Sequence, residues 1–147
     1  MPDRVRYAVN VCVLLRRADR WLLDLRQHDA DYGPDLIGLI GGHVEPADGP
    51  DDVLETAARR ELAEETGIDL AGTALHYVAS ELYDGPDRRP VVTVTYAAEL
   101  PSDQDPRLGG ATEPGRPSWW TLAEVEQDPR CAAWVPRLMR LADAVLG

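Results

Sequence analysis

Lysine is absent from this sequence, and arginine occupies all 15 of its Lys and Arg positions. The chain therefore has neither the lysine of a phosphate-binding P-loop nor a side-chain amine that forms a Schiff base with a carbonyl substrate. We interpret the use of arginine in place of lysine as a bias of genome composition.

Cysteine and long apolar runs are also scarce. Cys12 lies in an apolar segment far along the chain from Cys131, which favours reduced thiols over a disulfide. No run of 18 apolar residues is present to span a bilayer, and the polar residues 1–7 predict no signal peptide. We therefore expect a cytoplasmic protein without a membrane partner.

Acidic residues outnumber basic ones, and the formal net charge of the 147 residues is −11. This charge argues against a nucleic-acid polymer or an anionic membrane as partner. It allows a small-molecule nucleotide, because a divalent cation can bridge phosphates to acidic side chains. The length predicts a single domain, 1–147, with its own core, and the sequence leaves a homodimer open.

A glycine pair and a helix together form the most informative part of the chain. Residues 53–66 contain no Gly or Pro and are rich in strong helix formers. Asp52 is predicted as the N-cap with Glu55 completing a capping box, and Gly67 is predicted to end the helix in the left-handed conformation. The pair Gly41-Gly42 precedes this helix, and its backbone allows close approach of another group.

Three carboxylates of this helix, Glu61, Glu64 and Glu65, share one half of a helical wheel with its apolar residues. That half contains Val53, Leu54, Ala57, Ala58 and Leu62, and the opposite half contains Asp52, Glu55, Thr56, Arg59 and Thr66. A solvated acidic face is one interpretation. We favour a bound cation, because unpaired buried carboxylates are costly. An all-oxygen site without Cys or His suits Mg²⁺ or Mn²⁺.

At these residues the sequence resembles the Nudix hydrolase family. The family motif is Gly, five residues, Glu, seven residues, then Arg-Glu-aliphatic-x-Glu-Glu-x-Gly-aliphatic, and the segment 60–68 matches its second half fully. Upstream, the acidic position is taken by Asp52, with nine residues rather than five after Gly42. The four extra residues are predicted within 46–50, where they lengthen the loop before the helix. Asp48 keeps the spacing from Gly42 but lies too far from Arg60.

The resemblance implies an α/β (α+β) fold, an α/β/α sandwich with a mixed β-sheet. It assigns the metal to Glu64, Glu65 and the carbonyl of Gly41, makes Glu61 a further ligand or the general base, and has Arg60 orient a catalytic carboxylate. In MutT-like members an acidic residue lies six positions before a late Trp. Glu113 stands six before Trp119, which makes it the candidate fourth acid; Glu81 and Glu99 are its rivals, and an exposed loop glutamate is the alternative.

Hydrophobic alternation and turn signals predict the remaining elements. Strands are expected at 5–15, 21–26, 74–82, 91–100 and 119–121, and helices at 122–127 and 134–145. The last helix is expected to bury a stripe formed by Trp134, Leu138, Leu141 and Val145.

By resemblance, the protein is a metal-dependent pyrophosphohydrolase that uses water to cleave a nucleoside diphosphate linked to another moiety. The first alternative is a Nudix-fold nucleotide-binding or sensor domain without hydrolysis, but such a domain would be expected to have lost acids of the motif. The second is non-hydrolytic diphosphate chemistry, for which Cys12 is a poor candidate. Arg26 and Tyr83 are candidates for substrate binding. Other aromatic candidates for stacking on a base are Trp21, Tyr32, Trp119 and Trp120.

Overall fold

The computed structural model describes residues 3–27, 30, 34–109 and 113–147. Its strands are β1 (Ala8–Arg17), β2 (Arg20–Leu25), β3 (Ile37–Gly38), β4 (Ile40–His43), β5 (His76–Asp84), β6 (Pro90–Glu99) and β7 (Pro117–Thr121). Its helices are α1 (Val53–Thr66), α2 (Leu122–Gln127) and α3 (Trp134–Leu146), with 3-10 turns η1 (Pro46–Asp48) and η2 (Pro86–Arg88). Within these described residues no helix is long and apolar enough to cross a membrane.

The sheet has seven strands and is mixed. Its main path runs β3-β2-β1-β6-β5, while β4 pairs with β1 and β7 pairs with β2. Among the paired strands of the described residues, the central pair β1 and β6 is parallel and the others are antiparallel. The parallel pair requires a long crossover between its strands, and the segment that contains β4 and α1 lies within this crossover.

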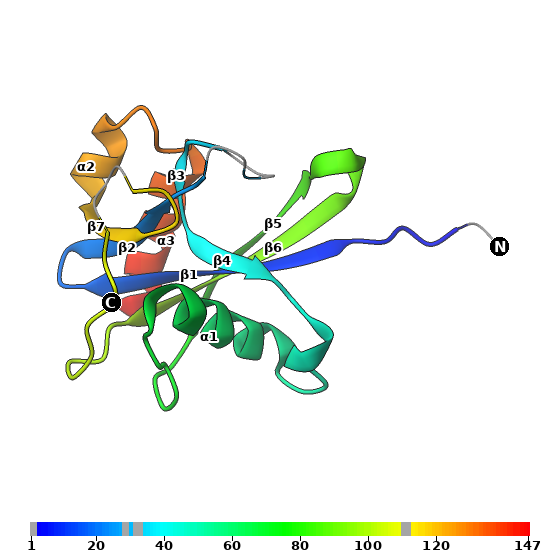
Figure 1. Cartoon of the computed structure of the whole chain (residues 1–147), viewed down its shortest axis with the longest axis horizontal. Helices are drawn as coiled ribbons and strands as arrows, with labels where there is room; N and C mark the ends of the chain where they lie inside the picture. Colours follow the sequence, from blue (N-terminus) through cyan, green and yellow to red (C-terminus); the bar gives the residue numbers. More distant parts are fainter. Residues whose placement is uncertain (1–2, 28–29, 31–33, 110–112) are drawn as a thin grey trace.

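Helices cover both faces of the sheet, which confirms the expected sandwich (Figure 1). Successive residues of a strand point to opposite faces, so Val11 and Val13 of β1 pack towards α1, whereas Leu14 packs towards α3. Both cores are closed by buried apolar side chains of the helices, such as Leu62 of α1 and Leu138 of α3.

Helix α1 has the predicted bounds, but its N-terminus differs from the prediction. Asp52 has φ 48° and ψ 43° and makes no side-chain cap, so the expected capping box with Glu55 is wrong. Glu55 instead accepts a hydrogen bond from the Tyr96 hydroxyl at 3.0 Å. At the other end Gly67 takes φ 78° and its N–H bonds the Ala63 carbonyl, as expected.

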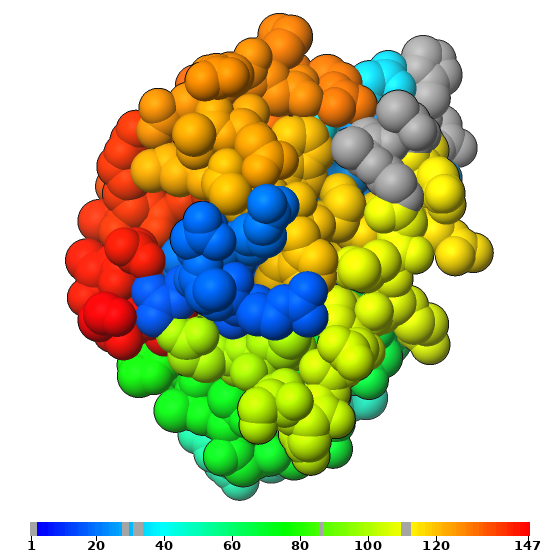
Figure 2. Space-filling model, turned by 90° about the vertical axis from the view of Figure 1, so that its left-hand side faces the viewer, coloured from blue at the N-terminus to red at the C-terminus, as the bar shows by residue number. Residues whose placement is uncertain are grey.

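Thr66 also departs from the helical-wheel prediction, because it is buried rather than on the outer face. Its hydroxyl donates to the Leu62 carbonyl at 2.6 Å and accepts from the Ile68 N–H at 3.1 Å. The segment after β6 lies against this end of α1, as Figure 2 shows in the lower part of the view. There the Arg107 N–H donates to the Thr66 carbonyl at 2.8 Å.

The predicted start of the first strand and the predicted buried face of the last helix need correction. Val5 and Tyr7 were expected in the first strand, but β1 begins at Ala8, and both side chains are at least half exposed on an arm that extends from the body (Figure 1). In α3 the buried residues are Val135, Leu138, Met139 and Ala142. Trp134 and Val145, which were expected in the buried stripe, are 50% and 42% exposed.

Candidate active site

The two glycines of strand β4 lie directly beneath helix α1 and against strand β1. A Cβ on Gly42 would overlap the carboxylate of Glu61, and a Cβ on Gly41 would overlap the carbonyl oxygen of Val11. No larger residue fits at either position without movement of the backbone or of the site itself. The glycine pair therefore sets how closely the helix carboxylates approach the backbone of β4.

Arg60 links the loop before α1 to the carboxylates of the helix. Its Nε and Nη2 donate to the two oxygens of Asp48 at 2.8 and 2.9 Å, and Nη2 also donates to the His43 carbonyl at 2.9 Å. Its Nη1 donates to Glu61 at 3.0 Å and lies 3.4 Å from Glu64. Arg60 thus orients Glu61 through a fork of charge-assisted hydrogen bonds.

The partner of Arg60 corrects the prediction made for the loop. Asp48, not Asp52, is the supporting carboxylate: it is buried, and it also accepts the Glu45 N–H at 2.8 Å. The Arg60 guanidinium holds the pKa of Asp48 at about 2. Because η1 ends at Asp48, the four extra residues are 49–52, after the carboxylate rather than before it.

The three helix glutamates occupy different environments. The Glu61 side chain is 13% exposed, and burial raises its pKa despite the neighbouring Arg60. Glu65 accepts a hydrogen bond from the Gly41 N–H, while its Oε2 is buried without a partner. Burial raises the pKa of Glu65 to about 8, with further contributions from Asp24 and Glu61. Glu64 is 59% exposed at the rim, so two of the three carboxylates face inward.

Asp24 of β2 is an acidic residue near Glu65 that the sequence reasoning did not consider. Its Oδ1 is buried without a hydrogen-bond partner, and burial raises its pKa to about 6. Of the charges around Glu65, that of Asp24 raises the glutamate's pKa most. The alternation of residues along the strand could have indicated this position. Asp24 stands two residues after the buried Leu22 and so shares its face of the strand.

This arrangement fits a hard divalent cation. The donors are carboxylate and backbone oxygens, and Oε2 of Glu65 is buried without a hydrogen-bond partner. As placed, the described side chains form no group of three or more metal-ligating residues. Mg²⁺ does not require three protein side chains, because it keeps several waters and is commonly bound by one or two carboxylates together with substrate phosphates.

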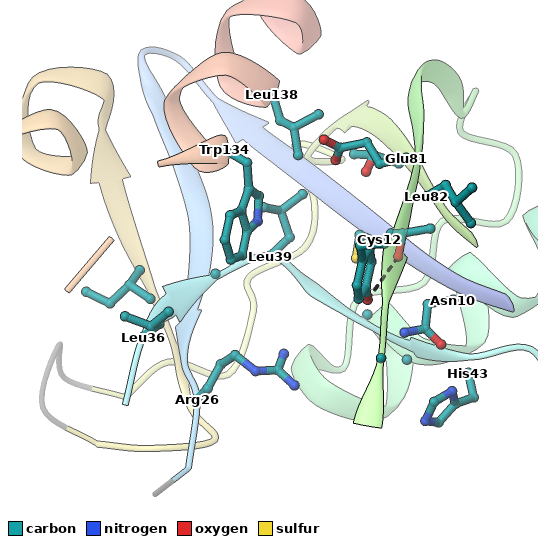
Figure 3. Close-up of a pocket in the computed structure, with 18 of the residues that line it drawn as sticks. Asn10, Cys12, Arg26, Leu36, Leu39, His43, Glu81, Leu82, Trp134 and Leu138 are labelled. Carbon is teal, nitrogen blue, oxygen red and sulfur yellow. Dashed lines mark hydrogen bonds between the residues drawn. The ribbon is translucent and has the colours of Figure 1, made fainter. Parts of the chain in front are cut away.

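A cavity of about 560 Å³ opens on the other side of β4, beside the same glycines. Figure 3 shows Arg26 pointing into it, with Trp134 and Leu39 along one wall and Asn10 and His43 at the opposite end. Residues of β5 form another wall: Glu81, Leu82, Tyr83 and Asp84. Its size lies within the range of small-molecule sites.

The cavity contains both predicted substrate-binding residues and one residue that the prediction assigned elsewhere. Arg26 and Tyr83 line it, and the Tyr83 hydroxyl accepts a hydrogen bond from Thr93 at 3.3 Å. Trp134 also lines the cavity, although its spacing suggested core packing. Cys12 is at the same surface, but burial raises its pKa to about 12, so its thiol is unreactive.

The remaining acidic and aromatic candidates have other partners in the structure. Glu113 is 58% exposed and pairs with Arg116 at 3.7 Å, Glu99 pairs with Arg16, and Glu81 pairs with Arg137 at 3.6 Å in the cavity wall. Among the other aromatic candidates, Trp21 and Trp120 are in the core, and Trp119 contacts Arg17. Tyr32 lies outside the described residues.

Comparison with known proteins places these features in a family. Residues 6–141 match the model of the NUDIX domain. A MutT protein from Methanosarcina mazei Go1 is 20% identical, with a TM-score of 0.71 and 97% of each chain covered. A MutT NUDIX hydrolase from Burkholderia pseudomallei is 22% identical, with a TM-score of 0.70 and coverage of 92% of this chain and 98% of that one.

A third structure was solved with a ligand. The NUDIX domain of Shewanella oneidensis NrtR, complexed with ADP ribose, is 26% identical, with a TM-score of 0.71 and coverage of 97% of this chain and 90% of that one. No curated protein sequence matches the chain.

Proposed function

The chain belongs to the NUDIX family and is a pyrophosphatase hydrolase, and from this we propose that it cleaves a nucleoside diphosphate linked to another moiety. Such substrates include nucleoside triphosphates. The observation that carries the proposal is the position of Gly41 and Gly42 between two features: inward carboxylates of α1 on one side and a cavity of about 560 Å³ on the other. A pyrophosphate at the glycines would contact both.

The metal in this proposal is Mg²⁺ or Mn²⁺. Glu64, Glu65 and the carbonyl of Gly41 would hold it, with Glu61 as a further ligand if it is not the base and Glu113 as the candidate fourth acid. When bound, the cation neutralises negative charge on the pyrophosphate. The all-oxygen donor set and the orphaned Oε2 of Glu65 support this assignment.

Glu61 is the group best placed to take a proton from the attacking water. Burial raises its pKa, which makes it a stronger base than an exposed glutamate, while Arg60 holds the carboxylate in one orientation at 3.0 Å. Arg60 is in turn fixed by Asp48. This chain of contacts supports Glu61 as the base and Arg60 as the residue that positions it.

The cavity would take the organic part of the substrate. Arg26 lines the cavity and lies near the acidic site, where its charge lowers the pKa of Glu65. Its guanidinium suits a phosphate group of the substrate. The opposite wall carries Glu81 and Asp84, which would repel a phosphate and accept hydrogen bonds from a base or sugar. Trp134 and Tyr83 offer aromatic surfaces on which a base can stack.

A nucleotide-binding domain without hydrolysis is the competing function; the similar NUDIX domain complexed with ADP ribose shows that a domain of this fold can bind such a ligand. A screen of nucleotides distinguishes the two. Nucleoside triphosphates, ADP ribose and dinucleoside polyphosphates are incubated with the protein and Mg²⁺, and the phosphate products are identified by chromatography. We expect hydrolysis that stops in excess chelator and returns with Mg²⁺ or Mn²⁺. Nucleotide binding without any product would support the binding domain, and full activity in chelator would refute the metal.

A further inference from the structure

Strand β2 carries a carboxylate on the face that α1 covers. Asp24 pairs with Gly38 of β3 and with Pro117 of β7, so it lies within the sheet rather than at a loop. It shares a face with Leu22, which is buried in the core beneath α1. Both cross-strand neighbours lack a side chain that could pair with a carboxylate.

Two oxygen atoms on this face are buried without a hydrogen-bond partner: Oδ1 of Asp24 and Oε2 of Glu65. Buried carboxylate oxygens are normally hydrogen-bonded or neutralised by a cation. Glu65 receives the Gly41 N–H through its remaining acceptor capacity, and Arg26 is the cation that acts on both acids. Arg60 already pairs with Glu61, so Arg26 is left to balance two carboxyl groups, those of Asp24 and Glu65.

We propose that Asp24 is an additional carboxylate of the divalent-cation site, opposite Glu65, so that the cation is bound between strand β2 and helix α1. The proposal rests on the metal dependence proposed above and adds a residue that lies outside the Nudix motif. Asp24 would act as a ligand or through a bound water, and its charge would strengthen cation binding before any nucleotide is present.

Direct cation binding tests this proposal without reference to activity. Free Mn²⁺ is titrated by electron paramagnetic resonance in the absence of nucleotide, with wild type, Asp24→Asn, Glu65→Gln and the double variant. We expect Asp24→Asn to weaken Mn²⁺ binding ~10-fold or more, in the range found for residues that support metal ligands. The two single effects should be non-additive in the double variant, because both residues act on one cation.

Asp105→Asn is the matched control, since it removes the same charge from a side chain that is 90% exposed. Thermal unfolding of the metal-free proteins accompanies each titration. We expect Asp24→Asn to unfold at the same or a higher temperature than wild type, because a buried carboxylate whose Oδ1 has no hydrogen-bond partner is replaced by a neutral amide. Asp24→Leu, which suits the apolar face of β2, serves as a second variant.

Each other outcome has a distinct meaning. Unchanged Mn²⁺ affinity in Asp24→Asn, with weaker binding in Glu65→Gln, overturns the role of Asp24 and leaves the metal site intact. Loss of the metal-free fold in both Asp24 variants shows that Asp24 supports the structure through Arg26, and it also overturns the proposal. Absence of Mn²⁺ binding in wild type refutes the metal dependence of the proposed function itself.

Discussion

Arg60 and Asp48 form a two-pronged ion pair across the loop that precedes helix α1, with distances of 2.8 and 2.9 Å between the paired atoms. Besides joining the helix to the loop, the pair fixes the position of the Arg60 guanidinium. The same guanidinium contacts Glu61 and the carbonyl of His43, so Asp48 determines the orientation of a residue that touches the candidate site. The Asp48 side chain is 2% exposed, which shields the pair from water and salt.

Replacement of Asp48 by Asn is therefore expected to lower both stability and turnover. The amide cannot balance the charge of Arg60, which would then lose its fixed position beside Glu61. We expect turnover to fall ~10- to 100-fold, as for other residues that orient a site from behind. Asp52→Asn is the control, because Asp52 makes no side-chain cap. An equal effect at both positions would contradict the role of Asp48.

The same ion pair predicts how stability depends on pH. The pKa of Asp48 is lowered from 3.8 to about 2 in the folded protein, so ionised Asp48 stabilises the fold above the unfolded pKa. That contribution is lost as the pH falls from about 4 through 2. We expect the difference in melting temperature between wild type and Asp48→Asn to be constant near pH 7 and to shrink below pH 4. A difference that is as large at pH 2 as at pH 7 would exclude ionisation as its cause.

The position of the four extra residues gives a prediction about the loop. Eleven residues separate Asp48 from Arg60, four more than the motif has between its acid and its arginine. Deletion of 49–52 keeps Asp48 and should leave the fold and metal binding intact. Deletion of 47–50 removes Asp48 and should lower the melting temperature and turnover. Circular dichroism and Mn²⁺ titration of both variants test this, and equal behaviour of the two would contradict the assignment.

Much of helix α1 could be predicted because its determinants are local. Strong helix formers run without interruption from Val53, and Gly67 supplies the left-handed residue that ends the helix. The acidic partner of Arg60 could not be predicted from local sequence. Spacing along the chain favoured Asp52, but η1 folds the loop so that Asp48, more distant in sequence, reaches the guanidinium.

Elements that depend on distant partners were missed or misread. Strands β3 and β4 are two and four residues long and contain three glycines, so they have almost no pattern of their own and are defined by pairing with β2 and β1. Trp134 has the spacing of a buried stripe, yet it borders the cavity because α3 turns Val135 and Met139 into the core instead. Periodicity locates a helix more reliably than it locates the exact direction of its buried face.

Charge removal at the helix glutamates tests the catalytic assignment. Glu61→Gln, Glu64→Gln and Glu65→Gln keep size and hydrogen-bonding capacity, and each should lower kcat by ~10²-fold or more, which is about 2.7 kcal/mol of barrier. Metal-free stability of Glu65→Gln should hold near pH 7, because burial raises the pKa of Glu65 to about 8 and the neutral amide replaces a largely protonated carboxyl.

Glu55→Gln is the matched control on the same helix, and glutamine keeps an acceptor for the Tyr96 hydroxyl. Its kcat should stay within about twofold of wild type, since the Glu55 side chain bonds the Tyr96 hydroxyl rather than Arg60. Steady-state kinetics with the best substrate from the nucleotide screen provides the measurement. Undiminished hydrolysis in all three site variants would remove these residues from the mechanism.

Trp134 tests whether the cavity binds the organic part of the substrate. Its side chain is half exposed at the first residue of α3 and lines the cavity beside Leu39, so its loss removes a stacking surface without opening the core. Trp134→Ala should raise KM ~10-fold, in line with the free energy of stacking on one base, and leave kcat nearly unchanged. Trp134→Phe should recover part of the affinity. Tyr77→Ala is the control, because Tyr77 is also exposed and aromatic but lies outside the cavity lining. A fall in kcat without a change in KM would place Trp134 with the chemistry instead of with substrate binding.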